Sequence, residues 1–521
     1  MIESTSAKTL NVLSPENSAE NVLSPSEQIQ KRRTKELVLA FCGPLGSGVS
    51  NVARTFIECL EENDYTTHYV KVSKFIEEVA PKNGYKINSF KKDNSLRIEE
   101  LQNGGNHLRK KFGSDILAQF TVRDIAVERQ KSLKSKNEEG IIRQSNRVAY
   151  IIESLKHPEE VQLLRSVYGN MFYIVGVLCA HHVRCNRLQR DKGIEHIAAI
   201  TLMERDESEE EKYGQQLKKT LQYADFFVRN NHENIKNIKN AIARYIDLIL
   251  GKPIITPTKH EYAMYMAQSA ALRSACLSRQ VGAAILNSNG EIIATGRNDV
   301  PKAGGGLYTI EDKENDYRCA YMQNGKCFND EYKKQIKEEI KKILTEEINE
   351  PGKVESISNR ISKETRLKDL LEFSKSVHAE MDAIISAVNV GNACLKDSTL
   401  YTTTFPCHSC ARHIIASGIK EVYYIEPFEK SLALELHNDS IVLEPSELES
   451  QTAKVVFQHF EGVAPRQYIN LFCSYTDRKE NGTVIKKNNR VAIPVIPMFL
   501  DTYLDYEAKV IAHLKKLEMD K

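Results

Sequence analysis

The stretch that decides the fold of the first half of this chain reads Leu37-Val-Leu-Ala-Phe-Cys-Gly-Pro-Leu-Gly-Ser-Gly-Val-Ser50. Its apolar run, 37–41, is typical of a buried parallel strand, and the glycines after it are typical of a tight loop that opens a helix over 51–60. Alternation of strands and helices predicts an α/β domain with a parallel sheet. The further strands are expected at 67–72, 148–152, 172–179 and 225–229, and a closing helix at 235–250.

The length of 521 residues exceeds one ordinary domain core. We expect a disordered tail at 1–33, a first domain at 34–255 and a second domain at 256–521. The tail is rich in Ser, Asn, Glu and Pro and carries the pentapeptide NVLSP twice, at 11–15 and 21–25. The repeat is consistent with a flexible segment or with a docking motif.

Composition narrows the class of protein. The chain has 72 Lys and Arg against 70 Asp and Glu, a formal net charge of +2, with 41% hydrophobic and 27% charged residues. Such values are typical of soluble globular proteins and disfavour a protein that coats nucleic acid or an anionic membrane. No apolar run reaches the roughly 18 residues of a membrane span, and the start lacks the features of a secretion signal. We therefore expect a cytoplasmic protein without a membrane partner, whose eleven cysteines are reduced thiols or metal ligands rather than disulfides.

Two short motifs in the second half indicate a metal site. His378-Ala-Glu380 opens one expected helix (376–388), and Cys407-His-Ser-Cys410 opens another (407–417). Cysteines three apart on a helix place both sulfurs on one face, so both thiolates can bind one zinc with His378 as third ligand. Three protein ligands leave a coordination position for water, as in catalytic zinc sites. The alternative is a closed structural site completed by His408 or His413.

Glu380 lies two residues after the first ligand, where its carboxylate can face the bound water and transfer a proton. H-x-E followed by P-C-x-x-C is the signature of zinc nucleobase deaminases. In that chemistry, water attacks C4 of cytosine, Glu380 protonates N3 and then the departing ammonia, and uracil is formed.

With these motifs the second half resembles the deoxycytidylate deaminase branch of the cytidine deaminase superfamily. The resemblance implies a three-layer α/β/α domain, bound Zn²⁺, and contact of Asn298 with the sugar or base. The alternative for Asn298 is an asparagine that stabilises its own turn. The chain departs from the family at Arg297, usually tyrosine, and at Asp382, usually asparagine, which leaves the phosphate state of the substrate open. The matching segments are 279–285, 294–301, 378–384, 402–411 and 418–424.

The glycine loop fits the P-loop pattern G-x-x-x-x-G-K-[ST], except that Val49 replaces the lysine. Its backbone N–H groups can still cradle the phosphates of a nucleoside triphosphate, and Ser50 can hold Mg²⁺. Without the lysine, phosphoryl transfer loses its main charge stabiliser, so nucleotide sensing or a structural, partner-binding role is favoured over kinase activity. The candidate nucleotide-binding residues are Gly43, Gly46, Ser47, Gly48, Val49 and Ser50.

Other residues near this loop are candidates for supporting roles. Glu153, after the strand at 148–152, is either a metal-holding carboxylate or a solvated strand end. The missing cation has three candidate replacements at helical spacing, namely Arg184, Arg187 and Arg190.

The whole chain resembles bacterial anti-phage dCTP deaminases, in which a P-loop kinase-like domain precedes a deoxycytidylate deaminase domain. The resemblance implies zinc-dependent deamination of free dCTP and/or dCMP to dUTP/dUMP, depletion of the deoxycytidine nucleotide pool on infection, silencing by a small inhibitory RNA, and a homo-oligomer. The alternatives are a housekeeping dCMP deaminase with a nucleotide-sensing domain, a single-stranded nucleic-acid cytosine deaminase, and a nucleotide kinase with a deaminase-like regulator.

Three features of the second half stay open at this stage. The charged segment 330–350 predicts a solvated helix or one that packs on another subunit. Cys319 and Cys327 are either buried thiols or ligands of a second metal. Lys430 and Arg466 are candidates for contacts with the substrate phosphates.

Overall fold

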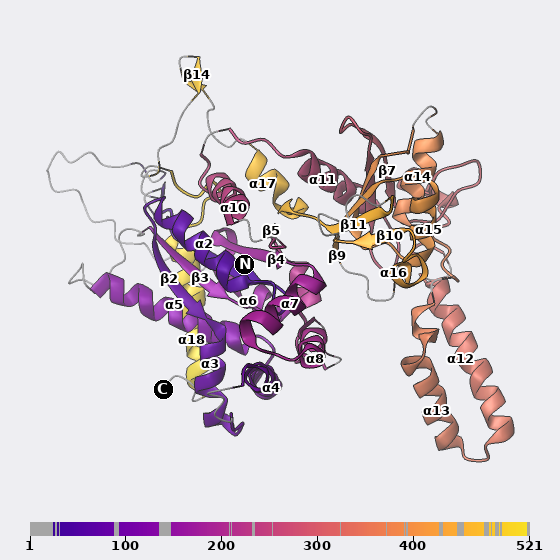
Figure 1. Ribbon diagram of the computed structural model, residues 1–521, viewed down its shortest axis with the longest axis horizontal. Helices are drawn as coiled ribbons and strands as arrows, with labels where there is room; N and C mark the ends of the chain where they lie inside the picture. Colours follow the sequence, from indigo (N-terminus) through magenta and orange to yellow (C-terminus); the bar gives the residue numbers. More distant parts are fainter. Residues whose placement is uncertain are drawn as a thin grey trace, which may run out of the picture.

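The computed structural model describes residues 32–517, except for a small number of gaps. Most of residues 1–31, and with them the expected tail and the repeated pentapeptide, lie outside the described part. Figure 1 shows two α/β units side by side, with a helical hairpin projecting from the second. The gaps are 88–92, 135–146, 208, 210, 232–234, 253, 323–324, 371, 390, 392–393, 427–430, 445–452, 474–478, 481, 485–488 and 490–491.

The first sheet has the strand order β12-β5-β4-β1-β3-β2. Strands β1 to β5 run parallel, and their bounds agree closely with those expected from the apolar runs. β1 is buried along its whole length because it lies in the middle of the sheet with helices on both faces. The strands are β1 (Leu37–Cys42), β2 (Thr66–Lys71), β3 (Val148–Glu153), β4 (Phe172–Leu178) and β5 (Phe226–Arg229).

Alternate residues of β1 face two different hydrophobic cores, as the period of a strand requires. Leu37, Leu39 and Phe41 pack with α2 (Val49–Glu61) and α10 (Ile235–Ile249) on one face. Val38 and Ala40 pack on the other face with the remaining large helices of this unit. These are α3 (Val72–Val79), α4 (Asn94–Phe112), α5 (Ile116–Lys134) and α6 (Pro158–Tyr168), while α7 (His181–Lys192) and α8 (His196–Glu207) form a small core of their own.

The end of the chain returns to this first sheet. The short strand β12 (Gly462–Val463) pairs antiparallel with β5, and helix α18 (Leu500–Lys516) packs against α5 and α6 (Figure 1). Arg129 of α5 anchors α18, since its guanidinium donates to Glu507 at 2.6 Å and to Glu36 at 2.8 Å, with all three side chains buried. The division at residues 255 and 256 stays a prediction; residues 462–463 pair with the first sheet, and residues 500–516 pack on helices α5 and α6 of the first unit.

The second sheet has the order β10-β11-β9-β8-β6-β7. β6 pairs antiparallel with β7 and β8, whereas β8, β9, β11 and β10 run parallel. The antiparallel pair follows from the Asn-Gly turn at 289–290, where Gly290 has a φ of 85°. The strands are β6 (Gly282–Leu286), β7 (Ile292–Arg297), β8 (Thr399–Thr404), β9 (Glu421–Glu426), β10 (Ile441–Leu443) and β11 (Val455–His459).

Helices cover both faces of the second sheet. α11 (Lys259–Ala271) packs on β6 and β8 from one side, and α14 (Ala379–Asn389) packs on β7 and β6 from the other, beside α15 (His408–Ala416). α12 (Phe328–Glu347) and α13 (Pro351–Glu364) form the projecting hairpin, and no described residue of α12 is buried. The expectation of two α/β units is therefore confirmed.

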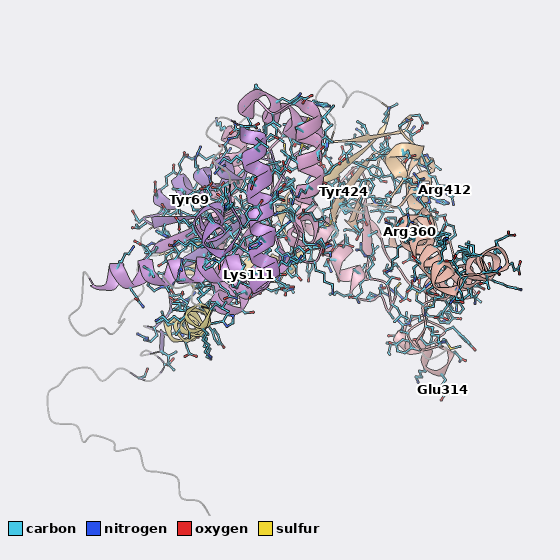
Figure 2. The ribbon with its side chains drawn as sticks, turned by 90° about the horizontal axis from the view of Figure 1, so that it is seen from below. Tyr69, Lys111, Glu314, Arg360, Arg412 and Tyr424 are labelled. Carbon is cyan, nitrogen blue, oxygen red and sulfur yellow. The ribbon has the colours of Figure 1, made fainter. Side chains whose placement is uncertain are left out.

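The two units contact each other through charged and polar groups. Arg229 of β5 donates to Gln458 at 2.6 Å and pairs with Glu461 at 3.4 Å, and Asn231 donates to Glu444 at 3.1 Å. In Figure 2, Tyr424 of β9 lies between the units, where its hydroxyl is 3.3 Å from His459. Apolar side chains of both units also share one hydrophobic core cluster, so polar and apolar contacts together connect the units.

Candidate active site

Two helix N-termini meet at the edge of the second sheet. His378 directly precedes α14 and accepts a hydrogen bond from the Asp382 N–H at its carbonyl. Cys407 is the N-cap of α15, and its Sγ accepts from the N–H of Cys410 at 3.4 Å. The positive ends of both helices therefore face the same point, where they stabilise thiolates.

The three expected ligands form one cluster. His378 Nδ1 lies 3.2 Å from Cys407 Sγ and 3.4 Å from Cys410 Sγ, and the three ligand atoms all lie within 4.8 Å of one another. Ligands of a tetrahedral zinc with the usual Zn–S and Zn–N bond lengths are about 3.6 Å apart, so this donor set fits zinc.

The cluster has three members among the described residues. His413, a candidate fourth ligand, donates from Nδ1 to Ser409 O at 2.7 Å, and His408 does not join the group either. Within the part of the chain that the structure describes, the arrangement therefore matches an open site better than a closed structural one.

Mutual contacts shift the pKa values of these side chains. The hydrogen bond with Cys410, together with His378, lowers the pKa of Cys407 to about 4. The hydrogen bond between His378 and Cys407 raises the pKa of His378 to about 9. The hydrogen bond between Cys410 and Cys407 raises the pKa of Cys410 well above its usual value. One thiolate is thus already favoured by the protein environment alone.

Glu380 lies in the first turn of α14, with its side chain buried and Oε2 3.5 Å from Cys410 Sγ. Burial raises the pKa of this carboxyl group. Glu380, His378 and Cys407 line a cavity of about 340 Å³. A carboxyl group that holds a proton readily, in a cavity beside metal ligands, is placed for proton transfer to a bound molecule.

The close approach of α14 to β7 depends on a glycine. A Cβ atom at Gly296 would lie 2.3 Å from Ala379 O and 2.3 Å from Ala383 N, which no side chain can do without moving the helix. Gly296 therefore fixes the position of the helix that carries Glu380.

Asn298 lies on the wall of the same cavity and is buried. Its Oδ1 accepts from Val281 N at 2.7 Å and its Nδ2 donates to Arg279 O at 2.9 Å. The side chain thus holds the segment that carries Arg279, while its contact with a substrate stays a prediction.

The two departures from the family pattern lie next to each other. Asp382 accepts a hydrogen bond from the backbone N–H of Arg297 at 2.9 Å, and the Arg297 guanidinium donates to Tyr308 O at 2.9 Å. Neither contact involves the metal cluster, so these residues act on the connection between β7 and α14.

The glycine loop, 43–50, connects β1 to α2, and Gly46 and Gly48 have φ values of 82° and 80°. Ser50 Oγ donates to Glu153 Oε1 at 2.5 Å, and Glu153 Oε2 is buried without a hydrogen-bond partner. Ser50 lies in the first turn of α2 and Glu153 at the end of β3, and a hydroxyl and a carboxylate are oxygen ligands of the kind that Mg²⁺ prefers. Val49, which stands where the P-loop pattern has lysine, has a buried apolar side chain.

Basic side chains surround this loop. Arg184 is buried, with NH2 2.6 Å from Glu207 and with Nε and NH1 unpartnered, and Arg187 NH1 lies 3.5 Å from Ser47 O. Arg190 instead pairs with its neighbour Asp191 on the surface. Lys156, which was not among the candidates from the sequence, follows β3 and donates to Gly43 O at 2.8 Å. In the sequence, only its position three residues after Glu153 indicates that it lies near the loop.

Four further candidates from the sequence are Cys319, Cys327, Arg466 and Lys430. Cys319 is buried and Cys327 half-buried, and in the described ranges they join no group of metal-ligating residues. Arg466 lies away from the metal cluster, donating to Tyr223 O at 3.1 Å and pairing with Asp225. Lys430 lies outside the described residues.

Comparison with known proteins places this site in a family. The model of the cytidine and deoxycytidylate deaminase zinc-binding region matches residues 257–426. The deoxycytidylate deaminase of Enterobacteria phage T4 is 30% identical over 175 residues, which cover 33% of this chain and 80% of the phage protein. The deoxycytidylate deaminase of Mus musculus is 28% identical over 165 residues, covering 32% and 63% of the two chains. Among solved structures, the dCMP deaminase of cyanophage S-TIM5 in complex with dCMP and dUMP is 18% identical, with a TM-score of 0.23, and covers 39% of this chain and 98% of its own. Because the T4 relative and the family model both match, this chain belongs to the cytidine and deoxycytidylate deaminase family.

Proposed function

We propose that the chain catalyses hydrolytic deamination of free deoxycytidine nucleotides, dCTP and/or dCMP, to dUTP/dUMP. The observation that supports this proposal is the buried Glu380 carboxyl group beside a His378, Cys407 and Cys410 cluster on the wall of a cavity. The zinc-binding region of the family and the chemistry of the cluster both support Zn²⁺ as the cofactor. Zinc held there supplies a Lewis acid that activates water at neutral pH.

The residues of the chain have distinct roles in the proposed reaction. Glu380 accepts a proton from the attacking water, passes it to N3 of cytosine, and carries a second proton to the leaving amino group. C4 gains the oxygen of water and loses ammonia, so cytosine and water give uracil and ammonia. Burial raises the pKa of Glu380, which makes its carboxylate a stronger acceptor for the proton of water.

The test is formation of uracil-containing product from dCMP, dCTP and cytosine-containing single-stranded DNA. Product from a free nucleotide supports the proposal and shows which phosphate state is preferred. Product from the DNA alone would instead favour a nucleic-acid editor, which the formal net charge of +2 disfavours. Absence of product from all three, with zinc bound, would contradict the proposed reaction.

Zinc content gives an independent prediction. We expect one zinc per chain by elemental analysis, and almost none in Cys410→Ser, because two ligands hold zinc far less tightly than three. Cys473→Ser is the matched control, since Cys473 is exposed and outside the cluster. Retention of zinc by Cys410→Ser would show that the metal binds elsewhere.

We also propose that the loop at 43–50 binds the phosphates of a nucleoside triphosphate with Mg²⁺, as a sensor rather than as a kinase. The contact of Ser50 with Glu153 and the buried, unpartnered Oε2 atom of Glu153 support this proposal. Lys156 and Arg187 are the cations that lie near the loop in place of a lysine at 49, since Lys156 Nζ donates to Gly43 O and Arg187 NH1 lies 3.5 Å from Ser47 O.

Exchange of Ser50 for lysine is expected to weaken binding of ATP in Mg²⁺ by tenfold or more, because the bulky cation displaces Glu153 and occupies the metal position. The measurement is a titration of the full chain with ATP, with and without Mg²⁺. Ser166→Lys, at an exposed position of α6, is the control. Equal binding by the intact chain and Ser50→Lys would rule out this site.

For the biological role, we propose anti-phage defence by depletion of the deoxycytidine nucleotide pool, in a cytoplasmic homo-oligomer silenced by a small RNA. The fusion of a glycine-loop unit to a deaminase unit motivates this proposal. Cellular dCTP and dCMP that stay unchanged on expression during phage challenge would contradict it.

No helix in the described ranges is long and apolar enough to cross a membrane.

A further inference from the structure

The cavity beside the metal cluster has a second wall that the family motifs do not supply. One side consists of His378, Glu380 and Cys407. The lining also includes Asn329, Asp330 and Lys333, from the first two turns of α12. The charged helix that the sequence marks as a solvated element thus contributes its first residues to the candidate active site.

Contacts with the segment before α14 hold this start of α12 in place. Lys333 Nζ donates to Lys368 O at 2.7 Å, and Asn329 Nδ2 donates to Leu370 O at 3.1 Å. Tyr332 stacks on Phe373 with ring centroids 5.3 Å apart. Figure 1 shows the hairpin leaving the unit near α14, α15 and α16 (Ala433–Leu436), so its base is fixed while its tip projects.

The cavity wall contains both paired and unpaired polar groups. Besides the metal ligands and Glu380, its wall contains two cations, Arg279 and Lys333, and the hydroxyls of Ser278, Ser374 and Ser376. Arg279 already lies 3.6 Å from Glu426. Asn329 Oδ1 is buried and has no hydrogen-bond partner, so it requires a donor.

A sugar phosphate supplies what this wall lacks. Its hydroxyl can donate to the unpartnered acceptor, and its phosphate can accept from the lysine and from the serine hydroxyls. Glu380 and the metal ligands require the base beside them, so the phosphate of a bound nucleotide lies elsewhere along the cavity, whose lining includes Lys333 of α12. The exposed carboxylate of Asp330 lies in the same wall and repels a phosphate there. The positive charge of Lys333 offsets this repulsion.

We propose that Lys333 is a specificity-determining residue that contacts the substrate phosphate and makes the site select nucleotides over nucleosides. This inference rests on the proposed deamination of free nucleotides and adds the residue that recognises the phosphate. Since Lys333 lies on the projecting hairpin, the hairpin is part of the substrate site as well as a solvated element.

The test compares Lys333→Ala with the intact chain on deoxycytidine, dCMP and dCTP. We expect kcat/KM for the nucleotides to fall about 10- to 100-fold, mainly through KM, because a charge-assisted hydrogen bond is lost, while deoxycytidine is affected little. Lys333→Arg should retain most of the preference for nucleotides. Lys334→Ala is the matched control, because Lys334 is exposed on the same helix and pairs with Glu331.

Binding of the products gives a readout that does not depend on turnover. Lys333→Ala should weaken binding of dUMP and dUTP but leave binding of deoxyuridine unchanged. A ratio of nucleotide to nucleoside affinity that is the same in Lys333→Ala and the intact chain would overturn the proposal, as would an equal loss for both ligands. Failure of the intact chain to deaminate any nucleotide would refute the proposed function instead, and the binding ratio would still decide the role of Lys333.

Discussion

Exchange of Glu380 for glutamine is expected to lower kcat for deamination by about 10²- to 10⁴-fold, the usual contribution of a positioned acid–base group. The amide keeps the volume of the buried side chain but cannot carry protons from water to N3 and to the leaving nitrogen. Glu380 is not one of the three clustered ligands, so zinc content should stay at one per chain. The measurement is single-turnover conversion of dCMP or dCTP, together with elemental analysis of the same sample.

Asp382→Asn is the matched control for this variant. It makes the same change from acid to amide two residues along α14, where the side chain accepts from Arg297 N, and it restores the residue that the family usually carries. Activity should therefore persist in Asp382→Asn. Comparable activity in Glu380→Gln and the intact chain would assign proton transfer to another group.

Replacement of Arg129 by methionine is expected to destabilise the first unit by about 3–5 kcal/mol, because it leaves the buried carboxylates of Glu36 and Glu507 without their cation. Both carboxylates lose their hydrogen bonds from the guanidinium, and α18 loses its main polar attachment to α5. The measurement is the midpoint of urea unfolding, together with proteolysis of the C-terminal segment, which should become faster.

Two further variants separate charge from packing. Arg360→Met removes an arginine, which is labelled on the helical hairpin in Figure 2, from an exposed pair with Glu364 on α13, and should change the midpoint little. The triple change Arg129→Met, Glu36→Gln and Glu507→Gln should recover part of the loss, since no buried charge remains. A single variant Arg129→Met as stable as the intact chain would show that α18 is held by apolar contacts alone.

The local sequence pattern was sufficient to predict most helices and strands and the residues of the metal cluster. Apolar runs such as 37–41 and 172–178 carry their own signal, because a strand buried on both faces needs no polar residues. The motifs at 378–380 and 407–410 could also be interpreted locally, since each places its ligands at a helix start that follows a strand or loop. The Ala-rich segment 262–277 has the composition of a helix along its whole length, but α11 runs from Lys259 to Ala271. It begins at the Thr258 and Glu261 capping box and ends before Ser274, whose hydroxyl donates to Asn298 O.

Long-range contacts decided the rest. Lys156 near the glycine loop and Lys333 in the active-site wall are ordinary lysines in the sequence, and only folding brings them to Gly43 O and to the cavity. The return of α18 to α5 likewise depends on Arg129 and Glu507, which are far apart in the chain. Helices and strands follow from residues a few positions apart, so the sequence by itself determined the two α/β units and the three clustered ligands. The tertiary structure decided which charges share a buried site, because that depends on which distant surfaces pack together.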